Sequence, residues 1–378
     1  MNVVVRHQAE ALAALGHRVE ILTRRSSPEM PAARRLAAGV TLRYLDAGPL
    51  RSVPKGDHEG FIDDFRAQAR LLGPWDIIHS HHWFSGMAML PLARELGVPH
   101  VQSFHSIAAD AATPLSAGER PESGGRMAGE AWLARESDLI VAVSAAEADT
   151  VVLRLGGSMD RVAIVPPGVD GALFHPLAPE AAAAGRAATD RGYAVVAGRL
   201  QPLKGLDLAI EAIAAVPAGL RPELVIAGDA SADYDGYIDE LGRLAARHGI
   251  TDGVRFVGPR SRVDLAALLR GARVVLVPSH SETYGLVALE AAASGVPVVA
   301  QGTGGLREAV LDGDTGLLIE SRDPQVWAAA LTEVLSDPAL AERLSLAARA
   351  RAESFDWPRS AASLVSAYCA LLPVPVCA

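Results

Sequence analysis

The stretch VVLVPSHSETYGLVALE, residues 274–290, joins a short run of aliphatic residues to a helix-forming run through a polar turn. A buried strand, a turn and a helix in this order form the repeating unit of parallel α/β sheets. Glu282 follows the predicted strand, and Glu290 lies about two helical turns further on, so both carboxylates can face one ligand. The stretch therefore predicts a fold class and a candidate site together.

The same alternation of apolar strands and Ala- and Leu-rich helices runs through the chain in two series. In the first series we expect a helix at 6–14, ended by Gly16, and strands at 18–22, 41–44, 77–79, 100–103, 139–143 and 161–165. In the second we expect strands at 194–198, 223–227, 254–257, 274–278, 297–300 and 316–319, with helices at 206–214, 237–248, 263–271, 286–294, 325–335, 338–355 and 358–371. The predicted fold class is α/β, with two Rossmann-like domains.

The length and a Pro- and Ala-rich interruption divide the chain. Its 378 residues suit two domains of ordinary size. We predict a first domain over 1–170, a linker over 171–192, a second domain over 193–355 and a C-terminal helix over 356–378 that is free to pack back on the first domain. Ligands of such sheets bind beyond the carboxyl ends of the strands, so a cleft between the domains is the expected site.

Charge and hydropathy exclude several classes of partner. The formal net charge of -9 argues against broad attraction to nucleic acid or anionic lipid. No run approaches the roughly 18–20 apolar residues that span a bilayer, and the first residues lack the apolar core of a secretory leader. We therefore expect a cytoplasmic protein without nucleic-acid or membrane partners, and the sequence does not indicate its oligomeric state.

A second motif, VAGRLQPLKG at residues 196–205, places two cations after another predicted strand and before a helix. Arg199 and Lys204 are suited to holding a diphosphate as it leaves. The backbone N–H groups that open the helix after Glu282 form a second anion site. The alternatives are that the cations are solvated loop charges and that the acids serve only as helix caps or surface residues. A P-loop motif is absent from the sequence, which argues against a P-loop NTPase.

Together the two motifs resemble the retaining family-4 glycosyltransferases, whose signature is G-R-L-x-x-x-K-G followed by Glu-x7-Glu. The segments PPGVD at 166–170 and GGLRE at 304–308 are similar to the same family. The resemblance implies a GT-B fold, in which two Rossmann-like domains face a cleft. It also implies that a sugar moves with retention from a nucleotide-sugar, a UDP-sugar by preference, to a small hydroxylated acceptor. No cofactor is required, although Mg²⁺ is compatible with the reaction.

The resemblance also assigns roles around the donor. Arg199 and Lys204 would contact the diphosphate, Glu282 the sugar hydroxyls and Glu290 the ribose. His105, in QSFHS at residues 102–106, matches a histidine beside the donor sugar. The expected catalytic set is therefore His105, Arg199, Lys204 and Glu282. The donor-binding set is Tyr284, Gly285, Leu286, Val287 and Glu290.

On the acceptor side, the first domain is similar to the D-inositol-3-phosphate glycosyltransferase group of the mycothiol pathway and to sucrose-phosphate-type enzymes. The positions that match the group's phosphate-binding residues are Asn2, Lys55, His82, Ser106 and Arg126. A lysine, an arginine and a hydroxyl suffice to bind a dianion. His82 and Ser106 replace a tyrosine and a threonine, which leaves a different acceptor open. The histidines at 79, 81 and 82 raise metal binding as a weak alternative, because no further ligand set accompanies them.

The beginning of the sequence departs from the family's pattern. Family members have a strand and a glycine-rich turn before the segment that here starts Met1-Asn2-Val3. We therefore expect the first domain to lack its first strand, with the true N-terminus lying upstream as one explanation. This departure keeps two other functions open: a sugar-nucleotide-binding partner protein without turnover, and a sugar-nucleotide epimerase of the same fold.

Overall fold

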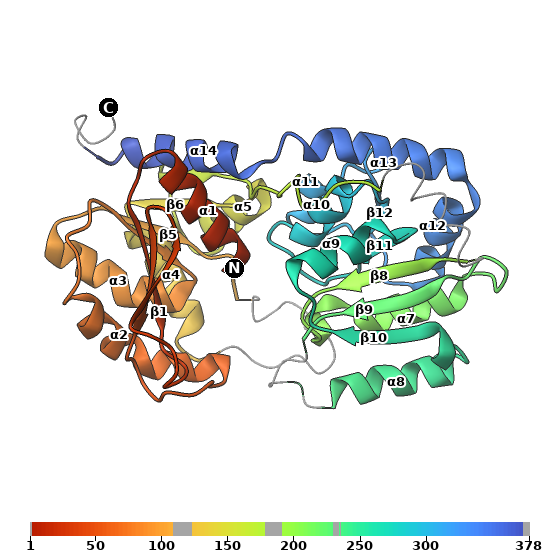
Figure 1. Ribbon diagram of the computed structural model, residues 1–378, viewed down its shortest axis with the longest axis horizontal. Coiled ribbons are helices and arrows are strands. Elements are labelled where there is room, and N and C mark those ends of the chain that lie inside the picture. The colour runs from red at the N-terminus through yellow and green to blue at the C-terminus, as the bar shows by residue number, and fades with distance from the viewer. Residues whose placement is uncertain (1, 109–122, 178–190, 230–233, 235, 373–378) are drawn as a thin grey trace. The chain divides into compact units, whose positions relative to one another are not determined.

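The computed structural model describes residues 2–108, 123–177, 191–229, 234 and 236–372. The chain forms two compact units (Figure 1). The first unit comprises Met1–Ala111, Arg120–Gly168 and Trp357–Ala378, and the second comprises Ala112–Glu119 and Val169–Asp356. Part of the expected linker, 171–192, lies outside the described residues. No described helix has the length and apolar character needed to cross a bilayer.

The second unit contains a six-stranded parallel sheet in the order β10-β9-β8-β11-β12-β13. Its strands are β8 (Tyr193–Ala197), β9 (Glu223–Ala227), β10 (Val254–Gly258), β11 (Val274–Val277), β12 (Val298–Gln301) and β13 (Leu317–Ile319). The order runs outward from β8 in one direction and from β11 in the other. The boundary between β8 and β11 is therefore the topological switch point, where doubly wound sheets bind their ligands.

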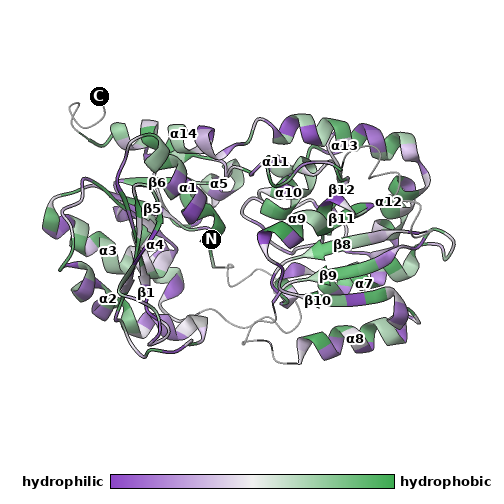
Figure 2. Ribbon diagram, in the orientation of Figure 1, coloured by the Kyte–Doolittle hydropathy of each residue, from purple (hydrophilic) through white to green (hydrophobic). Residues whose placement is uncertain are grey.

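Helices cover both faces of this sheet and bury its aliphatic strands. They are α7 (Leu206–Ala215), α8 (Tyr237–Arg247), α9 (Arg262–Arg270), α10 (Leu286–Ala293), α11 (Leu306–Ala309), α12 (Pro324–Ser336) and α13 (Pro338–Ala352). Every residue of β11 and β12 is buried, and Trp327 of α12 is fully enclosed in the same core. Figure 2 shows hydrophobic residues along the strands and mixed character along α8, as expected of a helix with one face on the core.

The first unit contains two separate sheets. One has the order β1-β3-β2, from β1 (Val19–Arg24), β2 (Ala33–Ala37) and β3 (Val40–Leu45). The other is parallel throughout, with β4 (Ile78–His81), β5 (His100–Ser103), β6 (Leu139–Ala142) and β7 (Val162–Ile164) in sequence order. The sequence did not predict β2, which pairs antiparallel with β3, because ARRLA contains no β-branched or aromatic residue.

Strands β1 and β4 each pair on one side only among the described residues. All six residues of β1 remain partly exposed, whereas β5 and β6 are buried throughout. One hydrophobic cluster nevertheless contains Leu45 of β3 and Ile78 of β4, so the two sheets share a core. The strands of the first unit thus divide between two sheets that contribute to one core.

The helices of the first unit come from both ends of the chain. They are α1 (Asn2–Ala14), α2 (Ile62–Ala69), α3 (Trp83–Leu96), α4 (Arg126–Glu136), α5 (Ala145–Leu153) and α14 (Trp357–Cys369), preceded in the α2 region by the 3-10 helix η1 (Lys55–Phe61). Helix α14 packs against α1, where the rings of His7 and Trp357 stack with centroids 5.0 Å apart. The C-terminal helix thus completes the first unit.

Candidate active site

The turn after β8 carries Arg199 and Lys204 to the switch point of the second sheet. A short 3-10 helix, η3 (Pro202–Lys204), ends at Gly205, whose φ is +64°. A Cβ at Gly205 would lie 2.1 Å from the carbonyl oxygen of Pro278, so the close approach of this turn to the end of β11 requires glycine. The backbone N–H of His280 donates to Leu203 O at 2.9 Å, which joins the turns that follow β8 and β11.

These turns bring Lys204 and Glu282 together. Lys204 Nζ lies 2.5 Å from Glu282 Oε1, and Ser279 Oγ donates to the same oxygen at 3.0 Å. Each of the two charged side chains is 19% exposed. Arg199 is exposed and forms no ion pair with the residues that the structure describes. One cation and one acid of the predicted site therefore meet directly, while the second cation remains in solvent at the same turn.

The glycines of the GGLRE segment hold the Glu282 turn from the other side. Gly305 N–H donates to Glu282 O at 3.0 Å. A Cβ at Gly304 would lie 2.3 Å from Glu282 O, and one at Gly305 would lie 2.0 Å from Thr283 O. Larger residues would displace the turn that positions the carboxylate, which explains why two glycines stand here.

Helix α10 begins immediately after this turn. Gly285 is its N-cap with a φ of +102°, and no described side chain caps the helix through a hydrogen bond. The first N–H groups of α10, including those of Leu286 and Val287, are thereby left for an anion. Tyr284 is buried, and burial raises the pKa of its phenol, so it is neutral near pH 7.

Glu290 lies in the second turn of α10, and its side chain is only 4% exposed. Burial raises the pKa of Glu290, and the Arg262 guanidinium opposes that shift through an ion pair of 2.6 Å. The same guanidinium lies 4.6 Å from the centroid of the Phe174 ring. The expected ribose-binding acid is thus held by an arginine that sequence reasoning did not identify.

In the first unit, the carboxyl ends of β4 and β5 gather three histidines. The ring centroids of His79 and His81 lie 4.2 Å apart, and those of His81 and His105 lie 5.0 Å apart. His81 Nδ1 is hydrogen-bonded to His105 Nε2 at 2.8 Å. Burial lowers the pKa of all three imidazoles, that of His81 to about 4, so they are neutral near pH 7. Among the described residues no group of three His, Cys, Asp or Glu side chains is placed to hold a metal ion.

A buried acid, Glu147, lies close to this cluster. Its carboxylate accepts the backbone N–H of Val143 at 2.7 Å, and its own N–H donates to the Ser144 hydroxyl that caps α5. Burial raises the pKa of Glu147 to about 7, opposed by the nearby backbone N–H groups of Val143 and His105. The sequence analysis did not single out this residue, because Ser-x-x-Glu is an ordinary helix-capping pattern.

The expected acceptor residues are only partly brought together. Arg126 is buried and pairs with Glu130 at 2.7 Å, and its Nη2 donates to Ser106 O at 2.9 Å. His82 is also buried, with its ring 5.2 Å from that of Phe84. Asn2 is exposed at the start of α1, and Lys55 opens η1. The structure therefore joins Arg126 to Ser106, but Arg126 is already engaged by a buried carboxylate.

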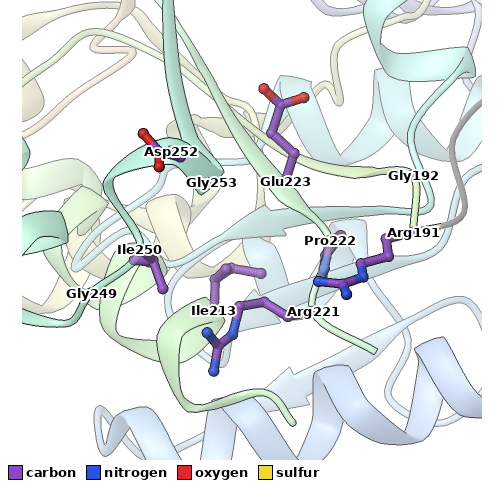
Figure 3. A pocket seen from close by; sticks show the side chains of 10 residues that line it. All are labelled: Arg191, Gly192, Ile213, Arg221, Pro222, Glu223, Gly249, Ile250, Asp252 and Gly253. Carbon is purple, nitrogen blue, oxygen red and sulfur yellow. The ribbon is translucent and has the colours of Figure 1, made fainter. Parts of the chain in front are cut away.

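One cavity of the described structure lies away from this candidate site. It has a volume of about 580 Å³ and opens at the amino ends of β8, β9 and β10, between Gly192, Glu223 and Gly253 (Figure 3). Two of the charged side chains that line it already have partners: Arg221 donates to the Ala214 and Val216 carbonyls, and Glu223 pairs with Arg255. Ligands of parallel α/β sheets bind at the opposite edge, so this cavity is not the candidate site.

Comparison with known proteins agrees with this geometry. Residues 165–351 match the family model described as glycosyl transferases group 1, and residues 1–168 match the glycosyl transferase 4-like domain. D-inositol 3-phosphate glycosyltransferases from Frankia alni and Stackebrandtia nassauensis are each 40% identical over 97% of this chain, which covers 93% and 86% of their lengths.

Solved structures show the same architecture. Sucrose-phosphate synthase from Thermosynechococcus elongatus is 27% identical, with a TM-score of 0.87 over 98% of this chain and 93% of that one. Anabaena HepE in complex with UDP and glucose is 23% identical, with a TM-score of 0.74 over 87% and 86% of the two chains. The second likeness supports the fold alone.

The two α/β units and their motifs thus define a glycosyltransferase of the GT-B fold class, as the sequence predicts. More particularly, the chain belongs to the glycosyl transferases group 1 family and carries the 4-like domain in its first half.

Proposed function

We propose that the protein moves a sugar from a UDP-sugar, with retention, to a small hydroxylated acceptor that carries phosphate. The observation that supports this most directly is the Lys204–Glu282 contact at the switch point of the second sheet. A diphosphate needs a cation, and the hydroxyls of a sugar need an acceptor such as a carboxylate. Lys204 and Glu282, in the turns that follow β8 and β11, place such a cation and such a carboxylate next to each other.

The proposed donor site uses the residues of the second unit. Lys204 and Arg199 neutralise the charge that grows on the leaving diphosphate, and the first N–H groups of α10 add hydrogen bonds to it. Glu282 accepts hydrogen bonds from the sugar hydroxyls, and Glu290, held by Arg262, accepts those of the ribose. Tyr284 in the same turn is buried and neutral, with its ring 6.2 Å from that of Phe355.

The proposed reaction breaks the bond between the anomeric carbon and the phosphate oxygen. A hydroxyl of the acceptor forms the new bond on the same face of the sugar, and its proton passes to the leaving diphosphate. Holding both reactants in place contributes roughly 7–11 kcal/mol to lowering the barrier, so little help from a protein base is required. We further propose that Lys204 and Arg199 neutralise the leaving diphosphate, so that no cofactor is required.

The acceptor class is inferred from the relatives and from one contact in the first unit. The relatives with 40% identity are named D-inositol 3-phosphate glycosyltransferases, and sucrose-phosphate synthase shares the fold at 27% identity. Arg126 and Ser106 lie together in the first unit, as a phosphate site would need. D-inositol 3-phosphate is therefore the first acceptor to test.

The test is transfer by the purified chain from UDP-glucose and from UDP-N-acetylglucosamine to D-inositol 3-phosphate, followed by mass spectrometry and anomeric proton NMR. We expect an α-linked product and an undiminished rate in EDTA. Donor hydrolysis or epimer formation without an acceptor would favour an epimerase. UDP binding without turnover of any donor would favour a binding protein.

Lysine chemistry offers a test of the donor site itself. Lys55 and Lys204 are the only lysines in the sequence, and all other basic side chains apart from histidine are arginines. An amine-specific acylating reagent should therefore label these two positions and the N-terminal amine. We expect UDP to protect Lys204 from acylation while Lys55 remains reactive, as read by peptide mass spectrometry.

A further inference from the structure

We propose that His81 is a positioning residue that fixes the ring orientation and tautomer of His105 through the hydrogen bond between their imidazoles. The inference rests on the proposed function and on the family resemblance, which matches His105 to a histidine beside the donor sugar. It adds a residue to which neither the motifs nor the comparisons assign a role. The two rings stack with an interplanar angle of 20°, and the bond joins Nδ1 of His81 to Nε2 of His105 at 2.8 Å.

The proton count of the pair explains why the bond controls the tautomer. Burial keeps both imidazoles neutral near pH 7, and a neutral imidazole carries one N–H. One proton must therefore lie between His81 Nδ1 and His105 Nε2. If His81 donates it, His105 carries its own proton on Nδ1; if His105 donates it, its Nδ1 is an acceptor. In both cases the hydrogen bond with His81 decides whether His105 Nδ1 is a hydrogen-bond donor or an acceptor.

His81 is itself held against a rigid neighbour. Ser103 Oγ donates its proton to Val141 O at 3.0 Å, so it must accept a proton from His79 Nε2, 2.9 Å away. The bare Nδ1 of neutral His79 then accepts from the Tyr368 hydroxyl at 2.6 Å. Both nitrogens of His79 thus have hydrogen-bond partners, which fixes the orientation of its ring. The His81 ring packs against it, because residues 79 and 81 lie on the same face of β4.

The backbone on both sides of the pair is strained. His82 and His105 have φ values of +74° and +58°, and they are the only described residues other than glycine with positive φ. Such conformations cost of order 1–3 kcal/mol each and cluster at functional sites. Both His81 and His105 also remain partly exposed at the end of the sheet, whereas a purely structural pair would gain from full burial. Strain next to partly exposed rings favours a functional pair.

A double-mutant cycle tests whether His81 acts through His105. We expect His81→Phe to lower kcat roughly 10- to 100-fold, because small misplacements of a reacting group have effects of this size. UDP affinity should stay unchanged, because the predicted UDP contacts all lie in the second unit. His81→Asn, whose amide can occupy the place of Nδ1, should restore kcat to within a few-fold. In a His105→Ala background, His81→Phe should have no further effect.

Multiplicative effects in this cycle would overturn the proposal, as would a kcat for His81→Phe equal to that of the native chain. Thermal unfolding of each variant separates these outcomes from loss of the fold. If the native chain transfers no sugar, the proposed function fails instead. The pair is then tested by long-range ¹H–¹⁵N spectra of histidine-labelled protein, in which His81→Phe must change the ring signals of His105. Unchanged His105 signals would refute the inference without any assay of transfer.

Discussion

Lys204 Nζ and Glu282 Oε1 lie 2.5 Å apart, so the cation proposed to hold the diphosphate and the acid proposed to hold the sugar neutralise each other in the ligand-free protein. A nucleoside diphosphate must compete with the carboxylate for the lysine. A complete donor also brings sugar hydroxyls, which give the carboxylate new partners. We therefore propose that the ion pair favours the intact donor over the spent nucleotide and assists product release.

Glu282→Gln separates these two effects. Removing the carboxylate charge should tighten UDP binding roughly tenfold, equivalent to about 1.4 kcal/mol, because Lys204 loses its competing partner. The same change should reduce kcat for transfer, because the sugar loses a charged acceptor. Calorimetric titration with UDP measures the first effect. Glu320→Gln, an exposed acid paired with Arg307, is the matched control, and weaker UDP binding by Glu282→Gln would contradict this account.

Lys204→Ala should lose most of the activity. Removing one group that stabilises the charge developing in a transition state costs about 3 kcal/mol, or roughly two orders of magnitude in rate. Lys204→Arg should recover only part of this loss, because a planar guanidinium does not occupy the place of a compact ammonium. The measurement is kcat/KM with the donor varied. A kcat/KM for Lys204→Ala equal to that of the native chain would show that the lysine does not stabilise the transition state.

Lys55→Ala tests whether the acceptor carries phosphate. We expect the acceptor KM to rise for D-inositol 3-phosphate and to stay constant for unphosphorylated inositol, because only the former presents a dianion. Arg126 is a poorer probe. Its loss would leave Glu130 buried and unpaired, which costs about 3–5 kcal/mol of stability and confuses binding with folding. Equal KM values for Lys55→Ala and the native chain would contradict the proposal that the acceptor carries phosphate. The assignment of the chain to its family would not change.

Glu147 should make the stability of the first unit depend on pH. Its pKa is raised from 4.5 to about 7 in the folded protein, so folding is favoured when the carboxyl is protonated. This contribution is fully present below about pH 4.5 and is lost as the pH rises towards 7, a change of about 3 kcal/mol. Glu147→Gln should flatten that part of the unfolding profile. Exposed Glu136→Gln is the control, and parallel profiles for Glu147→Gln and the native chain would contradict the prediction.

The buried parallel strands could be predicted closely from the sequence. The expected ranges 100–103 and 223–227 coincide with β5 and β9, because continuous aliphatic runs between turns leave little freedom. β2 was missed because its ARRLA sequence lacks strand propensity and depends on pairing with β3. The convergence of Lys204 on Glu282 followed from the rule that strands end at one edge of the sheet.

The partners that hold the site could not be predicted in the same way. Arg262 lies 28 residues before Glu290, and His81 lies 24 residues before His105, so their contacts depend on tertiary packing. The positive φ of His105 could not be predicted from the sequence either, because histidine is enriched in that region but still adopts it in only a small fraction of cases. Motifs therefore indicated the groups proposed to meet the ligand, whereas the groups that hold them in place became visible only in the fold.

The separation of the first unit into two sheets should affect how the protein behaves in concentrated solution. Among the described residues β1 and β4 each have a neighbouring strand on one side only, and Ile21 and Leu22 of β1 are incompletely covered. Such strand edges recruit any extended peptide, including a second molecule of the same kind. We therefore expect the 378-residue chain to cross-associate through these strands in concentrated solution, and an added strand supplied as a peptide should suppress that association.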